Sequence, residues 1–145
     1  MKFICATLLL LCHTPSDYLD YDYQKKFTQE ITDCALNYNS SIYPYNRIPI
    51  TLVKAQAIQE SNWGRSRFAT EGNNFFGMKE FDLTEPHMKA KLNANAPWGL
   101  RKYHTMCDSV EDYMSLLSTS YKYEEFQELL LMQWFVNEVD LHALV

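Results

Sequence analysis

The strongest constraint on this chain is a short helix that has to stop just after a glutamate. Pro49 disfavours an earlier start, and Thr51 is predicted to be the N-cap, because its hydroxyl can accept a free backbone N–H. Glu60 then falls in the last helical turn. Gly64 follows, and a glycine adopts the left-handed conformation that ends helices without a Cβ penalty. The local sequence therefore predicts a helix that presents Glu60 at its C-terminal end.

Glu60 is predicted to be a general acid. The negative end of the helix dipole disfavours its ionisation, and Trp63, Phe75 and Phe76 are candidates for apolar walls that disfavour the charge further. A carboxylic acid that stays protonated near neutral pH can protonate a leaving oxygen. The alternative is a solvated glutamate at a helix end, which is the commoner fate of a single glutamate. The residues around Glu60 favour the general acid.

A run of short motifs surrounds Glu60 and continues beyond it. They are Ala55-Gln56-Ala57, Glu60-Ser61, Trp63-Gly64, Ser66-Arg67-Phe68-Ala69, Glu71-Gly72-Asn73-Asn74 and Phe76-Gly77. This string resembles the signature of bacterial glucosaminidases of the mannosyl-glycoprotein endo-β-N-acetylglucosaminidase-like group (glycoside hydrolase family 73), in particular of the Bax-like proteins. A weaker resemblance extends from Leu100 to Leu129. Asn62 stands where glycine is usual in the family, and its small polar side chain is expected to be tolerated.

The resemblance implies one lysozyme-like domain over residues 17–145, α+β but mainly α, with a small β-lobe. It implies hydrolysis of the β-1,4 bond after N-acetylglucosamine in peptidoglycan, with Glu60 as the acid and glycan strands as the partner. Muramidases and lytic transglycosylases use a similar glutamate at a helix end and remain the alternative enzymes. A wall-binding module without turnover is the non-enzymatic alternative. An amidase label also occurs in the family, but the sequence shows no zinc ligands or nucleophile pair for that reaction.

The same resemblance points to further site residues. A second glutamate in the lobe, Glu85 or Glu80, would act as base or stabiliser, unless the substrate's own acetamido oxygen takes that part. Tyr123 matches a tyrosine that lines the family's cleft, where a phenol would hydrogen-bond the substrate or stabilise positive charge. A solvated glutamate and a core aromatic residue are the respective alternatives. The predicted substrate-binding residues are Trp63, Asn74, Phe75, Phe76 and Glu80.

Residues 73–103, from the end of the motif through the lobe, are predicted to contain turns and strands. Asn73-Asn74, next to a glycine, favours a turn that holds the loop beneath the cleft. Short strands are predicted at residues 76–81 and 99–103, with a polar, proline-containing stretch between them. We expect this β-lobe to form the second wall of the cleft.

Periodicity predicts helices on both sides of this lobe. Apolar residues recur at helical spacing between Tyr23 and Tyr38, as core-facing residues do. Asp108 is predicted to be the N-cap of an amphipathic helix, with Glu111 as its capping-box partner. A last helix starts near Tyr121. Its predicted inward residues are Tyr123, Phe126, Leu130, Phe135 and Val139, and its apolar runs Leu129–Met132 and Trp134–Val136 are assigned to the core.

Residues 1–16 are predicted to be a signal peptide. Lys2 precedes an apolar run from Phe3 to Cys12, which is too short to span a bilayer. An uncleaved N-terminal core segment is the alternative. A large leucine immediately before Cys12 argues against a lipoprotein signal. The protein is therefore expected to be exported, without a stable membrane anchor, and to act as a monomer.

Composition and cysteine usage limit the remaining functions. Hydrophobic residues make up 47% of the chain, which is typical of a globular domain. The net charge is −5 and no basic stripe is present, so nucleic acid is not an expected partner. The four histidines have no ligand spacing, so neither a metal nor a cofactor is expected. Cys34 and Cys107 either pair in an oxidising compartment or remain buried thiols, and the sequence leaves both open.

Overall fold

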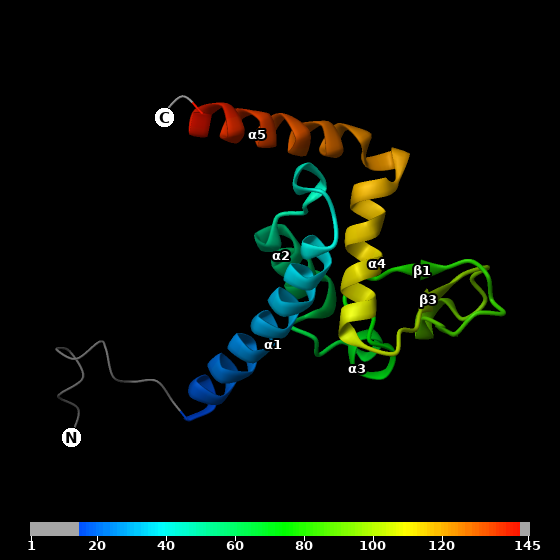
Figure 1. The fold of residues 1–145 in the computed structure, drawn as a ribbon. Helices are drawn as coiled ribbons and strands as arrows, with labels where there is room; N and C mark the ends of the chain where they lie inside the picture. Colours follow the sequence, from blue (N-terminus) through cyan, green and yellow to red (C-terminus); the bar gives the residue numbers. More distant parts are fainter. Residues whose placement is uncertain (1–14, 143–145) are drawn as a thin grey trace, which may run out of the picture.

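The computed structural model describes residues 15–142, with side chains described from Asp20 to Asn137. The N-terminal fourteen residues of the predicted signal peptide lie outside this range. The chain folds into five α-helices, three 3-10 turns and a small sheet within the described range (Figure 1). The helices are α1 (Pro15–Ser40), α2 (Ile50–Ser61), α3 (Arg67–Gly72), α4 (Met106–Thr119) and α5 (Glu124–His142). The 3-10 turns are η1 (Pro44–Asn46), η2 (Lys91–Asn93) and η3 (Tyr121–Tyr123). The predicted class, α+β and mainly α, is confirmed.

The core lies where α1, α2 and α4 pack together. The predicted stripe of α1 is buried, with Phe27 at 4% exposure and Ile31 at 0%. The helix that carries this stripe extends beyond both predicted ends, from Pro15 to Ser40. Val110 and Met114 of α4 are fully buried against it. Periodic apolar spacing was therefore sufficient to find the inner faces of these helices.

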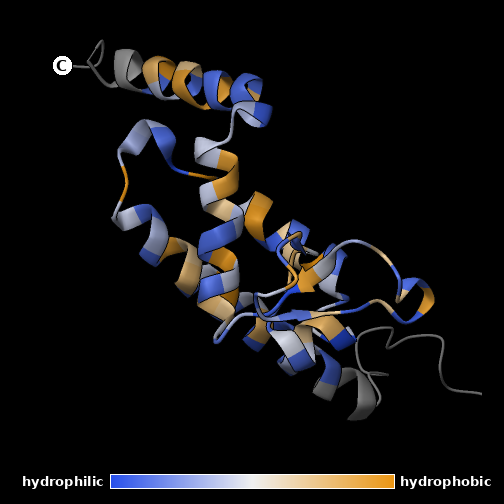
Figure 2. Cartoon of the chain, turned by 90° about the vertical axis from the view of Figure 1, so that its right-hand side faces the viewer, coloured by the Kyte–Doolittle hydropathy of each residue, from blue (hydrophilic) through white to orange (hydrophobic). Residues whose placement is uncertain are grey.

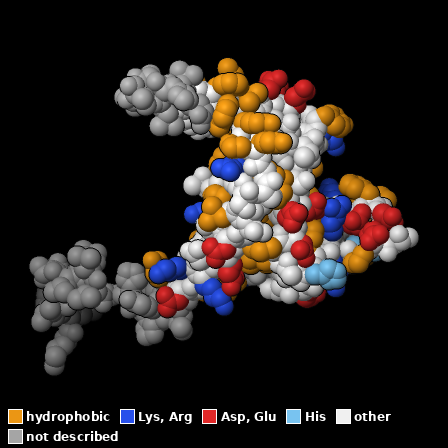
Figure 3. Space-filling model, viewed as in Figure 1, with side chains coloured by type: hydrophobic (Ala, Val, Ile, Leu, Met, Phe, Trp, Pro, Cys, Tyr) orange, Lys and Arg blue, Asp and Glu red, His pale blue; other side chains and the backbone are white. Residues whose placement is uncertain are grey.

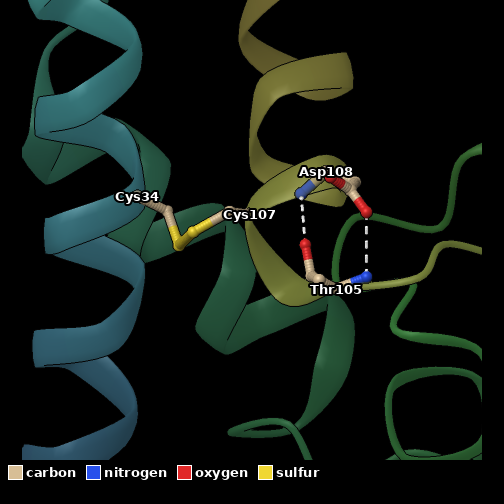
Figure 4. Close-up of a disulfide and its surroundings, with 4 residues drawn as sticks. All are labelled: Cys34, Thr105, Cys107 and Asp108. Atoms are coloured by element: carbon tan, nitrogen blue, oxygen red, sulfur yellow. Dashed lines mark hydrogen bonds between the residues drawn. A yellow bond between two sulfur atoms is a disulfide. The ribbon is translucent and has the colours of Figure 1, made fainter.

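A disulfide between Cys34 and Cys107 joins α1 to the first turn of α4 (Figure 4). The two cysteines are 73 residues apart in the sequence, and the bond decides between the two states that the sequence left open. In the chain-entropy model, a disulfide that closes a loop of this length lowers the entropy of the unfolded chain and so stabilises the folded state by about 4 kcal/mol. The link therefore holds together the two helices that carry most of the core.

The predicted cap of α4 is wrong by three residues. Thr105 is the N-cap, and its hydroxyl accepts the backbone N–H of Asp108, whose carboxylate in turn accepts the N–H of Thr105 (Figure 4). Asp108 therefore takes the third position of a capping box, in place of Glu111. The helix starts earlier than predicted. Just before it, Tyr103 donates its backbone N–H to the carbonyl of Gly72, and the side-chain amide of Asn73 donates to the carbonyls of Tyr103 and His104.

The β-lobe is a three-stranded antiparallel sheet in the order β1-β3-β2. β1 (Lys79–Glu80) and β3 (Gly99–Arg101) lie within the two predicted strands and pair with each other, Lys79 opposite Leu100. β2 (His87–Met88) was not predicted, because two residues are too few to show an alternating pattern. It pairs with the other edge of β3, His87 opposite Arg101.

The assignment of α5 to the core holds for one face only: Phe126 and Leu130 pack against the core, whereas most of the other apolar residues assigned to it are exposed. Figure 2 shows hydrophobic residues in successive turns of this helix, yet much of its apolar surface is exposed. The exposed side chains are Leu129 (65%), Leu131 (38%), Met132 (65%), Phe135 (54%) and Val136 (60%). α5 lies across η1 and the end of α4, so only one face of it is covered (Figure 1). Leu130 and Trp134 are half-buried on that face, and the side chain of Val139 lies outside the described residues.

Candidate active site

Glu60 is the penultimate residue of α2 and its side chain is exposed. The helix begins at Ile50 with Pro49 in the N-cap position, so Thr51 lies inside the first turn and the predicted cap is wrong. Proline's fixed φ suits the entry to a helix, which explains the earlier start. Val53, Ala57 and Ser61 form the buried face at a spacing of four residues; Glu60, three residues after Ala57, borders this face and its side chain is exposed in the last turn.

The turn after Glu60 contains three consecutive residues in the left-handed region. They are Asn62, Trp63 and Gly64, with φ of 51°, 59° and 74°. The helix ends at Ser61 with Asn62 as the C-cap, two residues before the predicted glycine. Asparagine tolerates this conformation better than most residues, which explains how it can replace the family's usual glycine. A non-glycine residue such as Trp63 in this conformation carries strain of about 1–3 kcal/mol.

Ser61 holds this turn in place. Its hydroxyl is fully buried, donates to the carbonyl of Ala57 at 2.5 Å and accepts the backbone N–H of Gly64 at 2.7 Å. Sequence reasoning did not assign Ser61 a separate role, although its position directly after Glu60 was visible. A Cβ atom at Gly64 would meet the ring of Phe27 at 2.8 Å, so the turn is also packed tightly against α1. The direction of the Glu60 side chain is thus set by buried neighbours.

The carboxylate of Glu60 lies beside Gly77. A Cβ atom built on Gly77 would be 3.8 Å from Oε2 of Glu60, and apart from the chain neighbours Phe76 and Met78 no other described residue would have a heavy atom within 4 Å of it. Gly77 is exposed and has φ of +66°. The space next to the carboxylate is therefore open above the backbone of Gly77, which is what a substrate oxygen needs to reach Glu60.

Tyr113 of α4 is a part of this site that sequence reasoning missed. Its spacing in the chain indicated no role of its own, but its ring stacks on Phe76 with centroids 4.2 Å apart. Burial, and to a lesser extent the negative charges that Tyr123 and Glu60 can carry, raise the pKa of Tyr113 to about 12. Tyr113 is therefore within the electrostatic reach of Glu60 and of Tyr123. At neutral pH the phenol of Tyr113 is a hydrogen-bond donor.

Tyr123 ends η3, immediately before α5, and 36% of its surface is exposed. It was predicted both to line the cleft and to point inward from the last helix. Its exposure fits the edge of a site better than the interior of the core. The serine Ser120, whose side chain accepts the N–H of Lys122, caps the short turn that carries it.

The three aromatic residues predicted to bind the substrate are Trp63, Phe75 and Phe76, and they differ in burial and in the rings that they contact. Phe75 is buried against Phe27, with ring centroids 5.9 Å apart, and Trp63 meets the same ring edge-on at 6.4 Å. Phe75 and Phe76 are 5% and 8% exposed, so both are mainly core residues. Phe76 reaches the site through its stack on Tyr113, while Phe75 and Trp63 support the turn from beneath.

Asn73 and Asn74 hold the loop beneath Gly77, as the sequence led us to expect. The Asn74 amide is 2% exposed; its nitrogen donates to the carbonyls of Met78 and Arg101, and its oxygen accepts the N–H of Met78. Asn73 donates to the carbonyls of Tyr103 and His104. Because the amide of Asn74 is fully used by the backbone, it acts on a substrate only through the loop that it supports.

Glu80 is held in a network of ion pairs between the lobe and α4. Its carboxylate accepts the N–H of Asp82 and pairs with Arg101 at 3.0 Å; Arg101 also bonds Asp112 at 2.6 Å. The N–H of Asp82 is the main cause that holds the pKa of Glu80 below its ordinary value; burial opposes it, and the charge of Arg101 lowers the pKa further. Tyr103 donates its hydroxyl to Asp112 at 2.5 Å. Burial, then this bond to a carboxylate, raise the pKa of Tyr103.

Glu85 lies in the loop between β1 and β2 and is exposed. Among the described residues its side chain has no hydrogen bond or ion pair, and no contact joins it to Glu60. Glu80, in contrast, is only three residues from Gly77, so the two Cα atoms are at most about 11 Å apart. Chain length alone thus keeps Glu80 close to Gly77, and Glu85 is exposed in the lobe.

Neither a metal-ligand cluster nor a membrane-spanning helix is present among the described residues. No group of three or more His, Cys, Asp or Glu side chains is placed to hold a metal ion there. No helix within residues 15–142 is long and apolar enough to cross a membrane.

Fold and site together define a mainly helical α+β domain built around a carboxylate at a helix end, with a β-lobe fixed beside it. The chain belongs to the mannosyl-glycoprotein endo-beta-N-acetylglucosaminidase family, whose model (Glucosaminidase) matches residues 37–137. This confirms the family that the motifs around Glu60 indicated.

Individual relatives and a solved structure agree with this assignment. The chain is 32% identical over 94 residues to Protein bax of Escherichia coli, covering 63% of this chain and 31% of that protein. It is 32% identical over 98 residues to the exo-glucosaminidase LytG of Bacillus subtilis, covering 59% and 33%. The chain thus spans about a third of the length of these relatives. The catalytic domain of the autolysin Auto from Listeria monocytogenes matches with a TM-score of 0.50 and 27% identity, over 78% of this chain and 67% of that one.

Proposed function

We propose that this domain hydrolyses the β-1,4 bond after N-acetylglucosamine in peptidoglycan, with Glu60 as the general acid. The observation that carries the proposal is the Glu60 carboxylate, exposed at the end of α2 and separated from Gly77 only by open space. Membership of the family supports the reaction class. The names of the relatives, an exo-glucosaminidase and an autolysin, support an amino-sugar polymer of the cell wall as the substrate.

In the proposed mechanism Glu60 protonates the glycosidic oxygen as the bond breaks. The ring carbon then carries positive charge, and water attacks it. The phenol of Tyr113 is within the electrostatic reach of Glu60, and we assign Tyr113 and Tyr123 to orienting the sugar or stabilising this charge. The Asn73-Asn74 loop and the Ser61 turn hold the two sides of the site at a constant separation.

Glu80 and Glu85 differ as candidates for the second carboxylate. Both oxygens of Glu80 already accept hydrogen bonds, and its lowered pKa makes it a poor acceptor of a proton. Glu85 is exposed and unpaired among the described side chains, so it is the candidate base if the reaction uses a protein carboxylate. The acetamido oxygen of the substrate is the second route. We assign Glu80 to anchoring the lobe through Arg101.

The deciding experiment is mass spectrometry of muropeptides after purified peptidoglycan is incubated with the wild-type protein and with Glu60→Gln. We expect new reducing N-acetylglucosamine ends with the wild type and none with the variant, which should fold normally because Glu60 is exposed. Reducing or anhydro-muramic ends would identify a muramidase or a lytic transglycosylase. No product from a folded wild-type protein would indicate a wall-binding module, and activity retained by Glu60→Gln would remove Glu60 from its role.

Export belongs to the same proposal. Removal of residues 1–16 as a signal peptide would place the domain outside the cytoplasm, where peptidoglycan is found. The Cys34–Cys107 disulfide supports this location, because such bonds persist in oxidising compartments. Analysis of the N-terminus of the mature protein tests the cleavage after Ser16.

A further inference from the structure

A row of four aromatic rings lies on the surface where α5 crosses η1. Tyr43 stacks on Tyr45 with centroids 5.5 Å apart and planes at 4°, and Tyr45 meets Trp134 edge-on at 6.0 Å. Trp134 in turn meets Phe135 at 5.2 Å. The two ends of the row are the most open, with Tyr43 70% and Phe135 54% exposed. In Figure 3 hydrophobic side chains gather on this part of the surface, over α5 and the segment beneath it.

The middle of the row forms one wall of a groove of about 250 Å³ between η1 and α5. Apolar side chains line much of it: Pro44, Tyr45, Ile48, Pro49, Ile50, Leu130 and Trp134. Arg47, Gln133 and Asn137 supply hydrogen-bonding groups at its margin. Although the chain as a whole has a net charge of −5, no aspartate or glutamate is among the described residues that line this groove.

Both helices that border the groove also reach the proposed active site. Ile50 begins α2 at the groove, and Glu60 ends the same helix about 15 Å further along its axis. Tyr123 immediately precedes α5, and Trp134 follows on that helix after another 15 Å or so. The groove is therefore separated from Glu60 by a distance that a polymeric substrate spans and a single sugar does not.

We propose that the η1–α5 groove and its aromatic row bind a glycan strand of the substrate polymer, away from the bond that is cleaved. This inference rests on the proposed function. Aromatic rings offer flat apolar faces to the C–H faces of pyranose rings, and amide and guanidinium groups at the margin reach hydroxyl and acetamido groups. A groove without acidic residues does not repel the carboxylates that peptidoglycan carries. α2 links the groove, at Ile50, to Glu60 at its other end.

The test measures binding of the hydrolysis-deficient Glu60→Gln protein to purified, insoluble peptidoglycan by co-sedimentation. In this background Tyr43→Ala and Phe135→Ala each remove an exposed ring. The matched control is Tyr21→Ala, which removes a tyrosine that is 62% exposed on α1. We expect each of the two row variants to bind about three- to tenfold more weakly, as the loss of one aromatic contact predicts, and the control to bind normally. Unchanged melting temperatures establish that the variants are folded.

A second measurement separates this inference from the proposed function. In the wild-type background, the row variants should lose activity on long glycan strands but retain kcat/KM on a soluble tetrasaccharide, which is too short to reach the groove. Row variants that bind peptidoglycan as tightly as Tyr21→Ala would overturn the inference while wild-type hydrolysis still supports the proposed function. A dimer in sedimentation velocity that Tyr43→Ala or Phe135→Ala converts to a monomer would also overturn it, because the row would then be a subunit interface.

Discussion

Oε2 of Glu60 lies 3.8 Å from the position that a Cβ atom on Gly77 would occupy, and Gly77 itself has φ of +66°. The site thus has no side chain at Gly77, which lies in the loop before β1. A side chain would also be unfavourable at Gly64, because a Cβ atom there would lie 2.8 Å from the ring of Phe27 on α1. These two glycines are conformationally alike but have different neighbours.

Gly77→Ala should therefore reduce activity more than stability. The left-handed conformation costs alanine about 1–2 kcal/mol, and the added methyl group is in ordinary contact with the carboxylate. We expect kcat/KM on peptidoglycan to fall by about tenfold or more, because small displacements of reacting groups are costly. Gly64→Ala is the control: its clash with Phe27 should make it the less stable of the two in chemical denaturation. Equal activity of Gly77→Ala and wild type would show that the space above Gly77 is not used.

Tyr113→Phe should slow turnover without weakening the fold. Phenylalanine keeps the stack on Phe76 but removes the phenol that lies near Glu60. We expect kcat to fall by about tenfold to a hundredfold and KM to change by less than about threefold, as for a group that acts in the transition state. Because the pKa of Tyr113 is about 12, the pH profile of the wild type should show no inflection from this residue between neutral pH and about pH 10.

Tyr123→Phe provides the comparison for Tyr113. It should also lower kcat more than it raises KM if its phenol reaches the substrate. An unchanged rate in Tyr123→Phe together with a slow Tyr113→Phe would assign the role to Tyr113 alone. Unchanged rates in both variants would leave the two rings with packing roles only.

The ion pairs of the lobe predict a pH dependence of stability. The pKa of Glu80 is lowered in the folded protein, so its contribution to stability is complete above the ordinary pKa of a glutamate and is lost as the pH falls through the folded-state pKa. Glu80→Gln should therefore have a lower melting temperature than wild type at neutral pH, and the difference should shrink towards zero near about pH 3. Calorimetry over this range makes the comparison, and a difference that grows with acidity would contradict it.

Removing the disulfide should destabilise the whole domain. Replacing both cysteines, Cys34→Ser with Cys107→Ser, should lower the free energy of unfolding by about 4 kcal/mol, because the unfolded chain loses a long closed loop. For a domain of this size that corresponds to a fall of roughly 10–15 °C in melting temperature. A reducing agent should lower the melting temperature of the wild type to that of the double variant and leave the variant unchanged. A reducing agent without effect on the wild type would mean that the cysteines do not pair in solution.

The features that follow from neighbours in the chain were predictable. The helix that ends at Glu60, the buried stripe of α1, the paired strands around β1 and β3 and the family itself were all readable from local spacing and motifs. These depend on φ/ψ preferences and on periodicity, which act over a few residues. Where such a prediction missed, as with the caps Thr51 and Asp108, the error was two or three residues, because Pro49 and Thr105 take the N-cap positions.

Tertiary structure decided which surfaces meet. Only packing shows that Tyr113 stacks on Phe76, that Arg101 joins Glu80 to Asp112, and that Cys34 meets Cys107. The same holds for α5, whose apolar composition predicted burial, whereas its crossing over η1 covers one face and leaves Met132 and Val136 in solvent. Composition determines what a helix would gain by burial, but the positions of its neighbours in space determine which face is buried. The sequence by itself thus determined the catalytic candidate and the family, and the fold determined which residues surround Glu60.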